Sequence, residues 1–150
     1  MLRDLIRHAG QLGAGVHFAS LDDDPELLGY FLPSRKLIVL RLGMTVPQTR
    51  WVLAHECGHA YYDHRCGGGR NTDALERRAD AYASRLLIDP AEYVRLERIN
   101  PDQYWLADEF SVSVDAIFAY EEHCLTRLHG VTYSGSRMGV GQWVHRDVSA

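Results

Sequence analysis

The sequence predicts an α+β fold, in which a small N-terminal sheet of about three strands packs on a series of helices. Two observations predict it. Short β-rich runs fill the first third of the chain, and two of them, Leu28–Leu32 and Leu37–Leu40, flank a turn at Pro33, which is typical of a hairpin. From Thr45 onward, apolar residues recur at helical spacing behind clear capping signals.

Composition narrows the classes of protein that fit. The 150 residues, 46% hydrophobic and 24% charged, suffice for one soluble domain. A net charge of -4 argues against direct nucleic-acid binding, and no apolar run approaches the roughly 20 residues of a membrane span. A secretory signal keeps its apolar centre uncharged, so the charges at Arg3, Asp4 and Arg7 argue against such a signal. Three cysteines without a CxxC pair predict reduced thiols and a cytoplasmic protein.

The N-terminal third is expected to contain one helix and the sheet. Apolar spacing predicts a helix over Met1–Leu12, ended by Gly13 and Gly15. The alternation over Val16–Leu21 predicts a strand, and an acidic turn over Asp22–Pro25 separates it from the hairpin.

Five further helices are expected, each opened by a recognisable cap. Thr45 and Gln48 form a capping box for a helix that runs to about Tyr62. The others are expected over Thr72–Leu87, after Asp89-Pro90, after Asn100-Pro101-Asp102, and from Ser113 to Gly130. The predicted domain therefore covers residues 1–130, and residues 131–150 form a Gly-rich, partly mobile extension.

The helix expected from Thr45 to about Tyr62 contains an HExxH motif, formed by His55, Glu56 and His59. Histidines four apart on a helix lie on one face, so both imidazoles can reach a single ion. Glu56 projects to the side, where it can reach a water in the open position of a catalytic metal site. The motif therefore predicts a zinc site with Glu56 as general base, although another divalent ion would fit the same ligands.

A third protein ligand is needed, and Glu76 is the best candidate. Glu76 and Asp80 lie four apart on the next predicted helix and share a face. Asp80 is placed to accept the free ring N–H of a ligand histidine. Alternative third ligands are His64, His123 and His129; the remaining histidines, taken as surface or satisfied side chains, are His8, His17 and His145.

Three segments in order resemble the ImmA/IrrE metallopeptidases, small bacterial, phage or mobile-element proteins with a gluzincin-type zinc site. These segments read AHECGHAYY, LERRADAYASRLLIDP and LADEFSVSVDAI, and the resemblance covers roughly residues 15 to 128. One departure is Ile88-Asp89 before Pro90, where the family usually has a single apolar residue. The resemblance implies a zincin-like fold with the HExxH helix at its centre. Positions that follow the family pattern are Glu76, Ala79, Asp80, Tyr82, Ala83, Leu86, Leu87 and Pro90.

The resemblance also implies an activity. Zn²⁺ would be held by His55, His59 and Glu76, with Glu56 as general base and Asp80 orienting a histidine. The expected function is a zinc-dependent endopeptidase that uses a metal-activated water to cleave a helix-turn-helix repressor of a phage, mobile element or stress regulon. One alternative is a non-catalytic repressor-binding protein with a structural or vestigial zinc site. Another is a toxin that acts on a host protein by the same zinc chemistry.

Three further expectations concern the surroundings of the site. The strand around Gly29–Leu32 is a candidate edge for an extended substrate. Tyr61, Tyr62 and His64 are nearby candidates for stabilising an oxyanion, without a signal that selects one. The segment 106–113 resembles a helix-turn-helix, but the apolar and acidic helix after it favours two helices that pack within the catalytic domain. Oligomeric state is left open.

Overall fold

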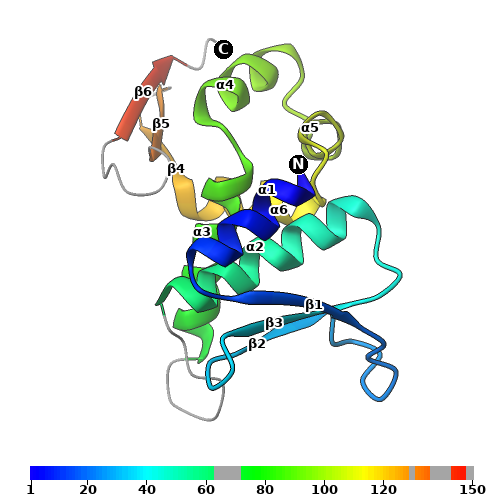
Figure 1. The fold of residues 1–150 in the computed structure, drawn as a ribbon. Coiled ribbons are helices and arrows are strands. Elements are labelled where there is room, and N and C mark those ends of the chain that lie inside the picture. The colour runs from blue at the N-terminus through cyan, green and yellow to red at the C-terminus, as the bar shows by residue number, and fades with distance from the viewer. Residues whose placement is uncertain (63–71, 129–130, 136–142, 148–150) are drawn as a thin grey trace.

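The computed structural model describes residues 1–62, 72–128, 131–135 and 143–147, with the side chains of 72 and of 126 onward excepted. It confirms the α+β fold (Figure 1). The elements run in the order α1 (Leu2–Gln11), β1 (Gly15–Ala19), β2 (Gly29–Leu32), β3 (Leu37–Arg41), α2 (Val46–Tyr62), α3 (Thr72–Leu87), α4 (Pro90–Ile99), α5 (Gln103–Phe110), α6 (Val114–Cys124), β4 (Leu125–Leu128), β5 (Val131–Gly135) and β6 (Trp143–Asp147).

The N-terminal sheet has the strand order β1-β3-β2. β2 and β3 form the predicted antiparallel hairpin, whereas β1 pairs with β3 in parallel. A parallel pair needs a crossover, and the segment from Ser20 to the hairpin provides it. Phe31, Ile38 and Leu40 alternate onto one face and are fully buried. β2 is therefore an edge strand whose inner side chains reach the core.

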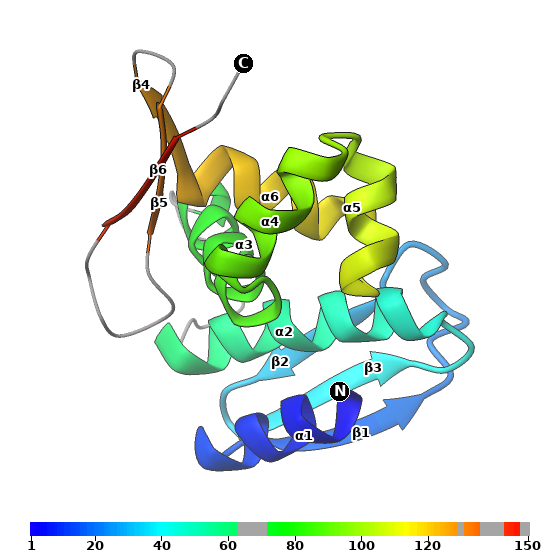
Figure 2. The ribbon, with the colours of Figure 1, turned by 90° about the horizontal axis from the view of Figure 1, so that it is seen from above.

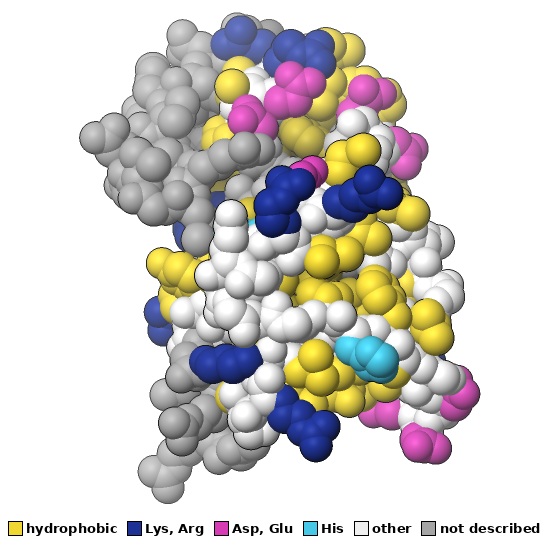
Figure 3. Space-filling view, viewed as in Figure 1, with side chains coloured by type: hydrophobic (Ala, Val, Ile, Leu, Met, Phe, Trp, Pro, Cys, Tyr) yellow, Lys and Arg dark blue, Asp and Glu magenta, His cyan; other side chains and the backbone are white. Residues whose placement is uncertain are grey.

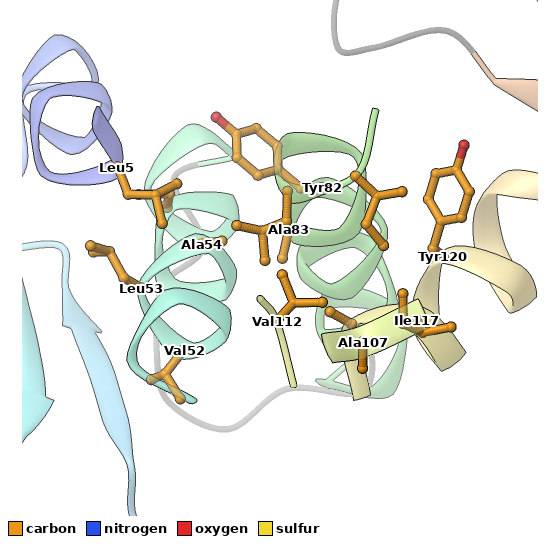
Figure 4. Close-up of a cluster of buried hydrophobic side chains, with 14 of the residues drawn as sticks. Leu5, Val52, Leu53, Ala54, Tyr82, Ala83, Ala107, Val112, Ile117 and Tyr120 are labelled. Carbon is orange, nitrogen blue, oxygen red and sulfur yellow. The ribbon is translucent and has the colours of Figure 1, made fainter. Parts of the chain in front are cut away.

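The helices form two layers above this sheet. α1 and α2 lie on its inner face, and α3 and α6 pack behind α2 (Figures 1 and 2). The shared core lies between these helices, with Leu53 of α2, Tyr82 and Ala83 of α3, and Ile117 of α6 all buried (Figure 4). The HExxH helix is thus central, as predicted.

Side-chain caps place the helix starts where the sequence predicts them. The Thr45 N–H donates to Gln48 Oε1 at 3.1 Å, and the Gln48 N–H donates to Thr45 Oγ1 at 3.3 Å, which is the reciprocal capping box. Asp89 accepts from the Glu92 N–H at 3.0 Å, and Asp102 caps α5 in the same way.

The prediction for the last helix is wrong at its end. α6 stops at Cys124 instead of Gly130, because Leu125 takes an extended conformation and begins β4. β4 pairs with β5, and β5 with β6, in a second antiparallel sheet, which replaces the predicted end of the helix and was not predicted from the sequence. Ser113 does occupy the N-cap position, but its hydroxyl makes no capping bond and is buried without a partner. The proposed boundary at residue 130 stays a prediction.

Further expectations concern α5, α6, the thiols and the surface. The helix-turn-helix-like segment packs inward, with Leu106, Val112 and Ile117 buried. Cys57 and Cys124 are free and buried, and Cys66 lies outside the described residues.

Within the described part of the chain, no helix has the length and apolarity needed to cross a membrane. On the face with α1 and β1, Lys and Arg side chains are interspersed with acidic and hydrophobic ones (Figure 3).

Candidate functional site

Close packing of α2 against α3 brings the predicted site residues together. A Cβ on Gly58 would stand 2.9 Å from the Cα of Ala79 and 3.1 Å from its carbonyl oxygen, so only glycine allows this approach without a shift. Gly58 lies between the two histidines of the motif, and Ala79 lies between Glu76 and Asp80. The contact between these two small residues therefore sets the distance from the histidines to the carboxylates.

Donor atoms of three side chains converge between the helices. His55 Nε2 lies 3.0 Å from Glu76 Oε2 and 3.0 Å from His59 Nε2, and His59 Nε2 lies 3.3 Å from Glu76 Oε1. On its other side, His55 Nδ1 lies 2.8 Å from Asp80 Oδ1. A ring N–H that donates to Asp80 leaves the Nε2 lone pair of His55 directed at the other donors.

This donor set fits a tetrahedral metal ion. Zinc binds histidine nitrogen and carboxylate oxygen at about 2.0–2.2 Å, so donors around one tetrahedral ion stand about 3.3–3.5 Å apart. The three separations in the structure, 3.0 to 3.3 Å, lie close to that value. His55, His59 and Glu76 are thus able to hold a metal, and these three ligands from the described part of the chain would leave one tetrahedral position for a water.

The electrostatics of the site favour a cation at this point. Burial alone would lower the pKa of His55, but its hydrogen bonds to Asp80 and Glu76 and the charge of Glu56 outweigh burial and raise it to about 10. Hydrogen bonding from His55 lowers the pKa of Glu76. Negative charge therefore concentrates where the three donors meet, and a metal cation is stabilised by the same field.

Glu56 is a buried carboxylate beside this centre, with an exposed fraction of 6%. Burial raises the pKa of the Glu56 carboxyl to about 7; the charge of Glu76 adds to this, and His55 opposes it. The Phe31 N–H on β2 donates to the Glu56 carboxylate, which also opposes the rise. The edge strand of the sheet thus holds the carboxylate of the motif in place.

The centre lies in a cleft of about 360 Å³ between the sheet and the helices. One wall is the segment 26–29, which leads into β2; the floor is the side of α2; the far wall comes from α3 and the start of α6. The described residues that line it are Glu26, Leu27, Leu28, Gly29, Trp51, Val52, His55, Glu56, Glu76, Asp80 and Asp115.

The structure brings together the five predicted site residues, and of the alternative ligands only His123 lies among the described residues. His123 on α6 stands 3.9 Å from Glu122 and is not part of the donor set, and His64 and His129 lie outside the described residues. Tyr61 and Tyr62 contact the ring of Tyr82 and do not line the cleft. Of the histidines set aside, His8 bonds the Tyr82 hydroxyl, His17 is exposed on β1, and the side chain of His145 is outside the described set.

Sequence reasoning missed several residues of the cleft. Glu26, Trp51 and Asp115 come from three separate segments and carry no local motif, so only the fold places them beside the metal centre. Gly58 had a detectable signal, since a glycine in the middle of a helix costs about 1 kcal/mol and usually has a packing reason.

A family comparison decides what kind of site this is. The model of a peptidase family, described as the IrrE N-terminal-like domain, matches residues 9–118. The chain belongs to the ImmA/IrrE family. The match runs from α1 into α6 and includes all five predicted site residues. ImmA/IrrE membership makes this a metallopeptidase-type domain, and the resemblance inferred from the sequence is confirmed. Among curated proteins, none matches the chain.

Proposed function

We propose that this ImmA/IrrE protein is a zinc-dependent endopeptidase that cleaves a helix-turn-helix transcriptional repressor in the cytoplasm. The observation that carries the proposal is the convergence of His55, His59 and Glu76 within 3.3 Å of one another, with the Glu56 carboxylate beside them in an open cleft. Membership of a peptidase family supports the hydrolase class. The free thiols Cys57 and Cys124 fit a reducing compartment.

Each residue has a distinct role in the proposed reaction. A bound zinc ion would supply Lewis-acid chemistry, polarising the scissile carbonyl and making a water more acidic. Glu56, held by the Phe31 N–H, accepts the proton of the attacking water and then delivers it to the leaving amine. Asp80 accepts the Nδ1–H of His55 and so fixes the ring with Nε2 toward the metal.

We propose that the backbone of the substrate peptide binds along the edge of β2. Among the strands that the structure describes, β2 pairs only with β3, and the Arg41 N–H donates to the Leu28 carbonyl at 2.8 Å. Backbone groups alternate in direction along a strand, so Gly29 directs its N–H and C=O away from β3. Gly29 also lines the cleft. An extended segment added here would pass alongside Glu56 and the metal ligands.

The Glu56→Gln substitution tests the proposal. The amide keeps the size of the side chain but cannot take up a proton, so cleavage should fall by about 10²- to 10⁴-fold while zinc content stays near one per chain. The control is Glu92→Gln, the same change on the exposed side of α4, which should leave cleavage unchanged. Mass spectrometry of purified helix-turn-helix repressors incubated with each protein measures the fragments.

Two outcomes would count against the proposal. Full activity in Glu56→Gln would remove the proposed general base. Tight repressor binding by zinc-loaded wild type, without fragments, would favour the alternative of a repressor-binding protein with a structural zinc site.

A further inference from the structure

We infer that the cleft selects peptides with a basic side chain next to an apolar one, and that Glu26 and Asp115 determine this preference. The inference rests on the proposed function, because it names the substrate class of the same cleft. Glu26 and Asp115 come from opposite walls, one from the segment before β2 and the other from the first turn of α6.

When the inner charges of the cleft are balanced, the carboxylates of Glu26 and Asp115 keep their negative charge. Five carboxylates line the cleft, and Lys and Arg are absent from its described lining. Glu76 and Asp80 face the two histidines, and Glu56 accepts the Phe31 N–H. A divalent ion would neutralise two of these three inner charges. Glu26 and Asp115, both exposed, then give the outer cleft its negative potential.

The wall that carries Glu26 is tied to the sheet. The Arg41 side chain donates from Nε to the Leu27 carbonyl at 2.8 Å and from Nη2 to the Leu21 carbonyl at 2.7 Å. It also bonds the Asp24 carbonyl, and Asp24 Oδ1 accepts the Glu26 N–H at 3.1 Å. One guanidinium thus holds the loop between β1 and β2 at three points. Glu26 is presented from a fixed backbone.

Apolar surface adjoins the two carboxylates. Leu28, which directly precedes β2, is 39% exposed although its carbonyl accepts the Arg41 N–H. Trp51 is half-buried, and its ring centroid lies 6.2 Å from that of His55. A peptide on the β2 edge would therefore meet an apolar surface near the metal centre and negative charge on either side of it. An arginine or lysine suits this arrangement, since its stem can pack on apolar groups while its charge reaches a carboxylate.

Peptide binding tests this inference without requiring turnover. Three fluorescein-labelled peptides share an alanine backbone with a central leucine flanked on both sides by Arg, by Gln or by Glu. Their dissociation constants are measured by fluorescence anisotropy with zinc-loaded Glu56→Gln protein. The Arg peptide should bind about tenfold more tightly than the Gln peptide, and the difference should shrink at high salt. The Glu peptide should bind least.

Matched variants assign the preference to the two carboxylates. Glu26→Gln and Asp115→Asn should each reduce the Arg-over-Gln ratio by about two- to fivefold. Asp23→Asn and Glu122→Gln change exposed acids on the same loop and the same helix but outside the cleft lining, and should leave the ratio unchanged. Equal binding of all three peptides, or equal effects of the cleft variants and the controls, would overturn the inference.

Cleavage of the same peptides by the wild-type protein separates this inference from the proposed function. An Arg preference in binding without any cleavage would support the specificity inference and contradict the peptidase. Cleavage of all three peptides at equal rates would support the peptidase and overturn the specificity inference.

Discussion

Replacing Gly58 by alanine should damage the metal site through packing alone. The added Cβ would stand 2.9 Å from the Cα of Ala79, whereas ordinary contact begins at 3.4 Å. The two nearest atoms, the Cα and the carbonyl oxygen of Ala79, belong to the backbone of α3, so α3 must move by about 0.5 Å. Glu76 and Asp80 then move with it. Metal sites tolerate deviations of about 0.2 Å in ligand distance, so the movement exceeds what the site can absorb.

Two measurements separate the expected effects. Overpacking should lower the free energy of unfolding of the metal-free protein by about 1–3 kcal/mol, measured by urea denaturation. Zinc affinity, measured by competition with a chromophoric chelator, should fall by about 10- to 100-fold, as for other losses of ligand orientation. Gly10→Ala is the control: its Cβ meets nothing within 4 Å, and alanine should stabilise α1 by about 0.5–1 kcal/mol.

The reasoning fails if Gly58→Ala binds zinc as tightly as the wild type. That result would mean that α3 adapts without moving its carboxylates. A loss of stability with unchanged zinc affinity would mean that Gly58 matters for the packing of the core and not for the positions of the metal ligands.

Three further predictions concern the site, the cleft wall and a helix cap. Asp80→Asn should weaken zinc binding by about 10- to 100-fold with little change in unfolding free energy, measured by chelator competition, because His55 loses its charged partner. Arg41→Met should raise KM about tenfold and leave kcat within about twofold in a peptide assay, since it releases the cleft wall; a fall in kcat alone would contradict this role. Asp89→Ala should lower the free energy of unfolding, measured by urea denaturation, by about 1 kcal/mol because it removes the cap of α4. Ser113→Ala removes no capping bond and should leave the free energy of unfolding unchanged.

Local signals in the sequence account for most of the fold. Side chains near in sequence set the helix starts, as Thr45 and Gln48 do for α2, so these starts are predictable from residue type and spacing. The β2–β3 hairpin is predictable for the same reason. The end of α6 is different: Leu125–Leu128 is a strand because it pairs with Val131–Gly135, and helical apolar spacing alone does not reveal that pairing.

The candidate site, like the fold, is predictable from the sequence only in part. The spacing of His55 and His59, and of Glu76 and Asp80, places each pair on one helix face, so these residues could be named from the sequence. The structure adds how the two pairs meet. The hydrogen bond from the Phe31 N–H to Glu56 joins residues 25 positions apart in sequence, and it depends on β2 lying at the edge of the sheet. No periodicity in the chain encodes such a contact.

Zinc content per chain is the most direct test of the central claim, that His55, His59 and Glu76 together bind the metal. The protein is purified without added metal or chelator, and bound metal is measured by mass spectrometry for the wild type, Glu76→Ala and the exposed control Glu92→Ala. We expect about one zinc per chain in the wild type and the control, and a large loss in Glu76→Ala. Equal zinc in all three proteins, or none in a folded wild type, would contradict the three-ligand site.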